Sequence, residues 1–255
     1  MGLELVTIAC LQDNYAYLIH DAATGEGALI DAPEAAPILA ALAARGWRLQ
    51  QILVTHHHSD HIGGVAEIVA ATGARVLGAA ADRHRLPPLD RAVVEGDTVA
   101  VGGELGHVLH VPGHTMGHIA FHFPASGLAF TADSLMAGGC GRLFEGSPQV
   151  MWASLQKLAA LPGETLVCSG HEYTMSNLRF AATIEPDNPA LQARIVRVGA
   201  ARARGEATVP SLLSEEMATN PFLRARLPAV KAAIGMAGQA DDLVFAEIRE
   251  RKNRF

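Results

Sequence analysis

The sequence has few aromatic residues, only three cysteines and no long apolar run. Aromatic residues make up 5% of the 255 residues, and the cysteines are Cys10, Cys140 and Cys168. An odd cysteine count without a CxxC spacing excludes a disulfide framework and a zinc ribbon, so we expect three small buried residues in a reducing compartment. No segment approaches the roughly 18–20 apolar residues that span a bilayer. The N-terminus resembles no signal peptide, which favours a cytoplasmic location.

Positive charge is also scarce. The chain has 20 Lys and Arg against 26 Asp and Glu, a net charge of −6. This balance argues against a general nucleic-acid binder and against a protein that binds anionic membranes, because both need a basic surface. With 49% hydrophobic and 18% charged residues, the chain is suited to a packed core and is too apolar for disorder. We expect a monomer.

Strand-like and helical segments alternate over the first two-thirds of the chain, and only helical segments follow. Expected strands cover 5–10, 16–20, 27–31, 51–55, 75–77, 98–101, 106–111, 119–123, 128–131 and 165–168. Expected helices cover 33–45, 64–71, 154–161, 175–182, 189–204, 211–217 and 241–252. The sequence therefore predicts an α/β domain over 1–173, with sheets covered by helices, and a helical domain over 174–255.

Most of the twelve histidines fall between residues 56 and 122, and the densest group directly follows an apolar strand. His56 and His58 are two residues apart. They would lie about 200° apart on a helix but on the same side of an extended chain. Asp60 and His61 fall on the following turn and can face a second ion, whereas His57 points away. The pattern indicates a metal site at a strand-to-loop transition.

Further candidate ligands also stand at the ends of expected strands. They are His114, Asp133 and His171, and in open α/β structures functional sites gather where strands end. Imidazole and carboxylate groups suit zinc, iron or manganese. His118 could support a ligand from outside the coordination sphere. The other histidines are expected to be exposed or hydrogen-bonded: His20, His84, His107, His110 and His122.

These motifs resemble the metallo-β-lactamase superfamily and, within it, the glyoxalase II (hydroxyacylglutathione hydrolase) family. The HxHxDH pattern at 56–61 is specific only to the superfamily. The matching stretches are 11–15, 55–64, 112–118, 132–146, 170–174, 185–188, 220–224 and 249–252. Of these, the stretch from Cys140 to Gly146, the GHEYT stretch at 170–174 and the C-terminal Arg/Lys pair narrow the resemblance to the family. The resemblance implies an αββα sandwich followed by a C-terminal all-helical domain.

The resemblance also implies a site that holds two divalent ions, most simply zinc, with iron or manganese as alternatives. His56, His58 and His114 would bind the first ion, Asp60, His61 and His171 the second, and Asp133 would bridge them. The implied glutathione contacts are Arg142, Phe144, Tyr173, Arg249 and Lys252. Phe144 stands where many family members have Tyr, so the hydroxyl is lost, whereas Arg142 keeps the charge of the usual Lys.

The implied reaction is hydrolysis of S-(2-hydroxyacyl)glutathione, chiefly S-D-lactoylglutathione, to glutathione and D-lactate, the second step of methylglyoxal detoxification. Two divalent ions lower the pKa of water from 15.7 toward about 7, which supplies hydroxide at neutral pH. The thiolate leaving group departs without a general acid, because its pKa is close to that of a free thiol. Asp60 has a double role, as a metal ligand and as the acceptor that orients the nucleophile. Arg249 and Lys252 would share one face of the last expected helix.

Three other functions fit the sequence less well. A glutathione-persulfide dioxygenase on the same scaffold needs a single iron, but Asp60, His61 and His171 complete a second site. A β-lactamase is disfavoured by the missing export signal and by the long helical tail. A non-catalytic metal-dependent binding module, such as a nucleic-acid partner, is disfavoured by the acidic charge and by the complete set of ligands.

Overall fold

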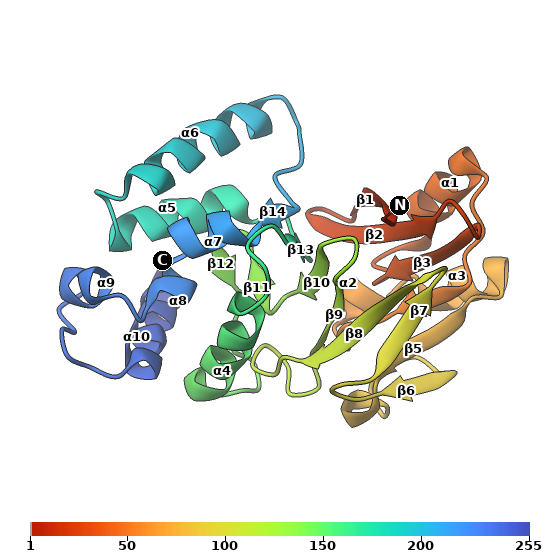
Figure 1. Ribbon diagram of the computed structural model, residues 1–255, viewed down its shortest axis with the longest axis horizontal. Coiled ribbons are helices and arrows are strands. Elements are labelled where there is room, and N and C mark those ends of the chain that lie inside the picture. Colours follow the sequence, from red (N-terminus) through yellow and green to blue (C-terminus); the bar gives the residue numbers. More distant parts are fainter. Residues whose placement is uncertain (1) are drawn as a thin grey trace. The chain divides into compact units, whose positions relative to one another are not determined.

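The computed structural model describes residues 2–255, and its contacts divide the chain into two compact units. Unit 1 comprises the residues up to His110 together with Met116–Ala132, and unit 2 comprises Val111–Thr115 and Asp133–Phe255 (Figure 1). The short segment 111–115 therefore packs with the later part of the chain.

Unit 1 begins with a six-stranded mixed sheet in which the strands follow chain order. The strands are β1 (Glu4–Cys10), β2 (Asn14–Asp21), β3 (Glu26–Ile30), β4 (Gln51–Leu53), β5 (Arg75–Ala79) and β6 (Arg91–Val93). β1, β2 and β3 pair antiparallel, and β3 to β6 pair parallel. Parallel pairs need crossover connections. These are supplied by α1 (Ala35–Arg45), α2 (Ser59–Ile62), α3 (Val65–Thr72) and the 3₁₀ turn Ala80–Asp82.

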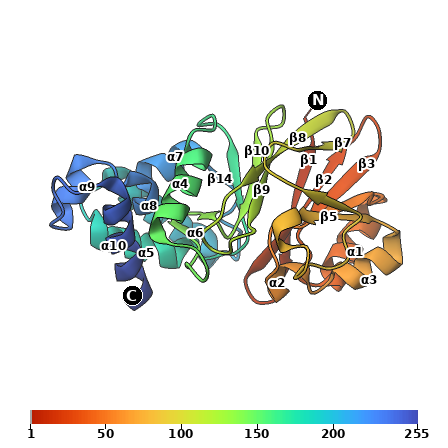
Figure 2. The ribbon, with the colours of Figure 1, turned by 90° about the horizontal axis from the view of Figure 1, so that it is seen from below.

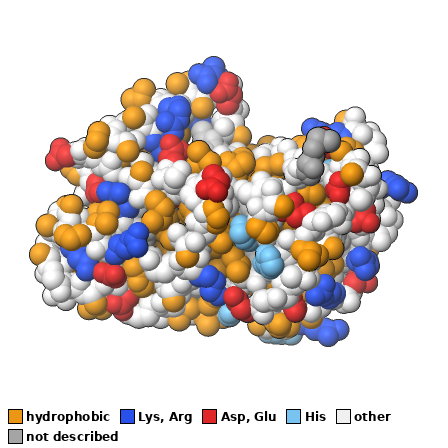
Figure 3. Space-filling model, in the orientation of Figure 1, with side chains coloured by type: hydrophobic (Ala, Val, Ile, Leu, Met, Phe, Trp, Pro, Cys, Tyr) orange, Lys and Arg blue, Asp and Glu red, His pale blue; other side chains and the backbone are white. Residues whose placement is uncertain are grey.

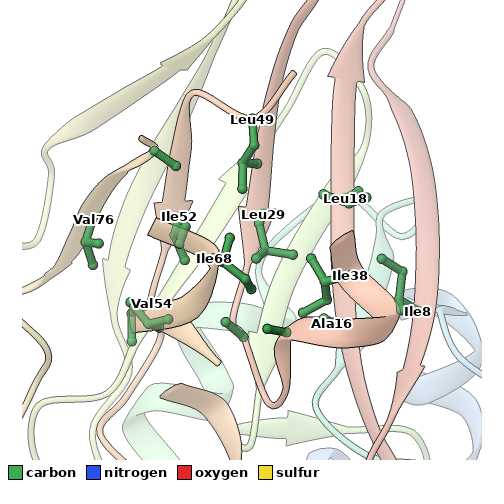
Figure 4. Close-up of a cluster of buried hydrophobic side chains, with 14 of the residues drawn as sticks. Ile8, Ala16, Leu18, Leu29, Ile38, Leu49, Ile52, Val54, Ile68 and Val76 are labelled. Carbon is green, nitrogen blue, oxygen red and sulfur yellow. The ribbon is translucent and has the colours of Figure 1, made fainter. Parts of the chain in front are cut away.

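The main core of unit 1 lies between this sheet and the helices α1 and α3 (Figure 4). Alternation along the strands turns Leu18 and Ile52 toward these helices, which contribute Ile38 and Ile68. All four side chains are at most 1% exposed, and each such burial stabilises the fold by about 1.5–3 kcal/mol. Both helices end where expected, because the glycines after them adopt left-handed φ values of 63° and 70°.

A second sheet in unit 1 is an antiparallel meander of β7 (Thr98–Val101), β8 (Glu104–His110), β9 (Ile119–Phe123) and β10 (Leu128–Ala132). It packs against the other face of the first sheet. The rings of Tyr17 and Phe130 lie 5.6 Å apart, and the Gln51 side chain donates a hydrogen bond to the carbonyl of Ala100. Every residue of β9 and β10 is buried, so this part of the sheet is covered on both faces, whereas β7 and β8 retain exposed residues.

Unit 2 is mainly helical. Its elements are β11 (Leu135–Met136), β12 (Gly139–Cys140), α4 (Pro148–Ala159), β13 (Leu166–Ser169), α5 (Thr174–Ile184), α6 (Pro189–Ala203), β14 (Ser211–Leu212), α7 (Leu213–Thr219), α8 (Pro221–Arg224), α9 (Pro228–Ala233) and α10 (Asp241–Arg254). α4 lies against α10, and α5 lies against α6 (Figures 1 and 2). Leu178 and Leu191 form part of the α5–α6 core.

Two expected elements of unit 2 differ in the structure. α4 begins at Pro148 rather than at Ser154, because the Ser147 hydroxyl accepts a hydrogen bond from Val150 N and proline fits the first turn. Residues 211–212, expected as the start of a helix, form β14, which pairs antiparallel with β13. The helical segment after residue 174 is therefore interrupted by one short strand.

The distribution of charged side chains on the surface agrees with the scarcity of Lys and Arg in the sequence. On the face drawn in Figure 3, Lys and Arg side chains are scattered among acidic and hydrophobic ones. Across residues 2–255, no helix combines the length and the apolar character that crossing a bilayer requires.

Candidate metal centre

The histidine-rich segment after β4 is extended, as predicted. His58 has φ −63° and ψ 142°, and α2 begins at Ser59. The Nε2 atom of His56 lies 3.2 Å from the Nδ1 atom of His58. Two nitrogens bound at about 2.0–2.1 Å to one tetrahedral zinc ion are separated by about 3.3 Å. The spacing of this pair therefore fits two ligands of a single ion.

His61 is oriented by a carboxylate that the sequence reasoning missed. Asp31 Oδ2 accepts hydrogen bonds from His61 Nδ1 and from the Thr55 hydroxyl, both at 2.8 Å, and Oδ1 accepts one from Thr55 N. Because His61 Nδ1 carries the donated proton, its Nε2 atom presents a lone pair. Asp31 holds this position at a left-handed φ of 55°. Its place at the end of the expected strand 27–31 was the available sequence signal.

Asp60 is also held by a residue outside the predicted set. Asn14 Nδ2 donates hydrogen bonds to the backbone oxygen of Asp60 at 3.0 Å and to its Oδ2 at 3.1 Å. Asn14 is 5% exposed and begins β2. This contact fixes both the backbone and the carboxylate of Asp60. The place of Asn14 between the expected strands 5–10 and 16–20 predicts a connection between strands but not this role.

Two other histidines of unit 1, His118 and His57, have different surroundings. His118 is fully buried and stacks on His56 with centroids 4.7 Å apart. His57 turns to another partner, since its Nδ1 lies 3.2 Å from Asp82 Oδ2. The side chains at 56 and 57 thus separate as the extended geometry predicts.

In unit 2, one carboxylate faces two imidazoles. Asp133 Oδ2 lies 3.4 Å from His114 Nε2 and 3.3 Å from His171 Nε2, and all three residues are buried. These separations again match the roughly 3.3 Å between two atoms bound to one tetrahedral zinc ion. Unit 2 therefore brings together His114, Asp133 and His171, which lie up to 57 residues apart in the sequence (171 − 114).

The ring of His114 is fixed from its other side. Its Nδ1 donates to the backbone carbonyl of Arg142 at 2.8 Å, which leaves Nε2 as the atom facing Asp133. The Phe144 ring meets His114 edge-on at 5.3 Å, and Tyr173 stacks on His171 at 4.7 Å. Phe144 is 61% exposed and Tyr173 39% exposed, so both offer an accessible aromatic surface beside the histidines.

Two of the three basic residues expected to bind glutathione, Arg249 and Lys252, are on α10, but their surroundings differ. Arg249 is buried, donates from Nη1 to the Cys140 carbonyl at 3.0 Å and lies over the Phe222 ring. The Lys252 ammonium lies near the rings of Phe180 and Phe255 and donates to a backbone carbonyl of α5. Burial, with the adjacent Arg249 charge, lowers the pKa of Lys252 to about 8.

Cys10, Cys140 and Cys168 form no disulfide bond and are buried, as expected from their number. Burial, with the nearby Glu34 charge, raises the pKa of Cys10 to about 11. Burial also raises the pKa values of Cys140 and Cys168. Since a neutral thiol is a poor nucleophile, the chemistry of this protein rests on its imidazoles and carboxylates.

Comparison with known families agrees with this geometry. A model described as the metallo-beta-lactamase superfamily matches residues 12–171, and one described as the hydroxyacylglutathione hydrolase C-terminus matches residues 172–255. A protein of Cereibacter sphaeroides named hydroxyacylglutathione hydrolase is 67% identical over the full length of both chains. This chain belongs to the hydroxyacylglutathione hydrolase family. The predicted fold, a metallo-β-lactamase domain followed by a helical C-terminal domain, is confirmed.

Solved structures extend the comparison beyond the family. ETHE1 from Myxococcus xanthus superposes with a TM-score of 0.68 at 26% identity, covering 98% of this chain and 90% of that one. TTHA1623, solved in a di-iron-bound form, superposes with a TM-score of 0.56 at 34% identity, covering 66% of this chain and 91% of that one. Membership of the family and the converging His and Asp side chains together make this protein a metal-dependent hydrolase.

Proposed function

We propose that this protein hydrolyses the thioester bond of S-(2-hydroxyacyl)glutathione, releasing glutathione and a 2-hydroxy acid. With S-D-lactoylglutathione the products are glutathione and D-lactate, which makes this the second step of methylglyoxal detoxification. The observation that carries the proposal is the 67% identity, over the full length of both chains, to a protein bearing the name of this activity. Every ligand position of the family motif is also occupied by histidine or aspartate.

We propose two divalent metal ions per chain, zinc first and iron or manganese as alternatives. His56, His58 and His114 would hold one ion, Asp60, His61 and His171 the other, and Asp133 both. Ligand separations of 3.2, 3.4 and 3.3 Å support this assignment, as does the di-iron form of the related TTHA1623. When bound, such a pair supplies a Lewis acid for the thioester carbonyl and lowers the pKa of water toward neutrality.

The residues around the ligands hold them in place before the substrate arrives. Asp31 fixes the tautomer of His61, the Arg142 carbonyl fixes that of His114, and Asn14 fixes the Asp60 carboxylate. Such preorganisation avoids rearrangement during the reaction. Asp60 then accepts a hydrogen bond from the attacking water and orients it toward the carbonyl carbon. The departing thiolate needs no protonating residue, because a thiol has a pKa of about 8.5.

We propose that two parts of the chain have different roles. Residues 1–173 form the catalytic domain, and residues 174–255 form the glutathione-binding domain. Arg142, Phe144, Tyr173, Arg249 and Lys252 are the proposed substrate contacts. A glutathione thioester carries two carboxylates, and Lys252 has the more accessible charge on α10. Arg249 would also affect substrate binding indirectly. Its guanidinium donates a hydrogen bond to the Cys140 carbonyl, and its charge lowers the pKa of Lys252.

An assay of the purified protein tests the proposal directly. Loss of the thioester absorbance of S-D-lactoylglutathione is followed, and the metal content of the same sample is determined. We expect hydrolysis, two metal ions per chain, and loss of activity in His56→Ala and Asp60→Ala. One iron per chain, with oxygen consumed in the presence of glutathione persulfide, would favour the dioxygenase function instead.

We propose a monomer that acts on a small molecule in the reducing cytoplasm and binds neither nucleic acid nor membranes. The net charge of −6 supports this view. Light scattering and a nucleic-acid shift assay at low salt test it, and a dimer or a salt-dependent shift would contradict it.

A further inference from the structure

A carboxylate that takes no part in the proposed chemistry is buried inside unit 2. Glu216 of α7 is 0% exposed, and four donors fill its two oxygens. Oε1 accepts from the Ser211 hydroxyl at 2.6 Å and from Arg194, whereas Oε2 accepts from Gly138 N at 2.7 Å and from Asn220 Nδ2 at 3.2 Å. Arg194 is itself only 1% exposed.

A buried ion pair of this kind is an uncertain source of stability. Removing two charges from water is unfavourable, and the attraction between them often does no more than offset that penalty. An apolar pair of similar volume could fill the same space. The ion pair alone therefore does not explain why a carboxylate is buried here. Glu216 also accepts a hydrogen bond from Gly138 N, which lies in the hairpin formed by β11 and β12.

Five side chains from outside this hairpin form hydrogen bonds with its backbone. The bonds join Asn220 Nδ2 to Met136 O and Gly139 O, Asn177 Nδ2 to Ala137 O, Ser169 Oγ to Ala137 N, Glu216 Oε2 to Gly138 N, and Arg249 Nη1 to Cys140 O. Gly138 has φ 66°, and a Cβ atom there would lie 2.8 Å from a methyl group of Leu178. The hairpin thus has little freedom to shift.

The hairpin connects directly to two proposed metal ligands. Gly141 N donates to Ser134 O at 3.2 Å and closes its base, with Asp133 immediately before and Arg142 immediately after. The base of the hairpin is tightly packed, because a Cβ atom at Gly141 would lie 1.9 Å from the backbone oxygen of Asp133. The Arg142 carbonyl in turn accepts from His114 Nδ1. A displaced hairpin would therefore displace both Asp133 and His114.

We propose that Glu216 and Asn177 are positioning residues for the metal centre, acting through the hairpin β11–β12. The inference rests on the proposed function only in taking Asp133 and His114 as metal ligands. The C-terminal helices accordingly have a role besides substrate recognition. They fix the hairpin β11–β12, which is flanked by the Asp133 carboxylate and by the Arg142 carbonyl that orients His114.

The decisive variant is Asn177→Ala. It removes one side-chain hydrogen bond to the hairpin and leaves alanine, which favours the helix, in α5. Gln192→Ala is its matched control, because Gln192 makes the same kind of bond to the Pro186 carbonyl at an exposed place on α6. Glu216→Gln is the second variant, since it leaves four donors to share one acceptor oxygen.

Zinc affinity of the metal-free proteins is measured by competition with a chelator, beside thermal unfolding of the same samples and kcat of the loaded enzymes. Removing a residue that contacts a metal ligand lowers metal affinity by about ten- to a hundredfold, and the hairpin would transmit the loss of Asn177 or Glu216 to Asp133 and His114. We expect at least tenfold weaker zinc binding and a kcat at least tenfold lower for Asn177→Ala, whose metal-free form still unfolds cooperatively, and wild-type zinc affinity for Gln192→Ala. We expect the same losses in Glu216→Gln.

Unchanged zinc affinity in a folded Asn177→Ala protein would overturn the positioning role, whether or not Glu216→Gln folds. Equal losses in Gln192→Ala would also overturn it, because the effect would then be one of general stability. Failure of the wild-type protein to hydrolyse the thioester would contradict the proposed function alone, since zinc binding is measured without substrate.

Discussion

Asp31 Oδ2 accepts a hydrogen bond from His61 Nδ1 at 2.8 Å, and the backbone of Asp31 adopts the left-handed region, at φ 55°. A non-glycine residue in this region is strained, and such strain persists where several contacts determine the conformation together. Here the hydroxyl and the amide of Thr55 supply those contacts. The strain therefore places a carboxylate where it can set the tautomer of a proposed metal ligand.

Replacing this carboxylate should weaken metal binding. Asp31→Asn keeps the shape of the side chain but makes a weaker acceptor for His61 Nδ1–H, so we expect about ten- to a hundredfold lower zinc affinity. Competition with a chelator measures it. Asp187→Asn, at an exposed position, is the control and should bind zinc like the wild type. Wild-type affinity in Asp31→Asn would show that the contact is not needed to orient His61.

Removing the metal should abolish activity and lower stability together. Ions that bind only the folded chain stabilise it by about 2.7 kcal/mol when their concentration is a hundred times the dissociation constant. We expect a chelated sample to be inactive and to unfold at a lower temperature, with both properties restored by zinc. Differential scanning calorimetry on the two samples measures the shift, and an unchanged unfolding temperature would argue against bound ions in the folded state.

Binding of glutathione analogues should depend on the charge of Lys252. Its pKa, lowered to about 8, means that the side chain is largely protonated at neutral pH and loses its charge as the pH rises through that value. A carboxylate ligand should therefore bind more weakly above pH 8. Calorimetry with S-methylglutathione on the metal-free protein measures this without titrating bound water. Lys252→Arg retains its charge, so its affinity should stay flat over the same range, and a parallel decline in both proteins would exclude Lys252 as the cause.

Phe144→Tyr should tighten substrate binding. The residue is 61% exposed beside His114, so a hydroxyl can be added without disturbing the core. One net hydrogen bond contributes about 0.5–1.5 kcal/mol, which corresponds to a roughly two- to tenfold lower KM. Steady-state kinetics on a glutathione thioester measure the change. Phe144→Leu, which also lacks the hydroxyl, should show no such gain, and an unchanged KM in Phe144→Tyr would place the substrate away from this ring.

The local pattern around the histidines was predictable because short-range geometry decides it. The i,i+2 spacing of His56 and His58 after an apolar strand has one arrangement that joins them on one ion, and the structure has that arrangement. The placement of Arg249 and Lys252 on one helix follows from helical periodicity in the same way. The division of the chain at residue 173 stays a prediction, because contact units and sequence segments need not coincide.

The sequence by itself determined the candidate ligands, the helical character of the last third and the family, because these follow from residue type, spacing and motif. Only the tertiary structure decided which groups hold the ligands: Asp31 behind His61, Asn14 behind Asp60, and the Arg142 carbonyl behind His114. It alone also revealed the buried Glu216. The physical reason is that such hydrogen bonds join residues distant along the chain, or use backbone atoms that every residue has, so no local pattern marks them.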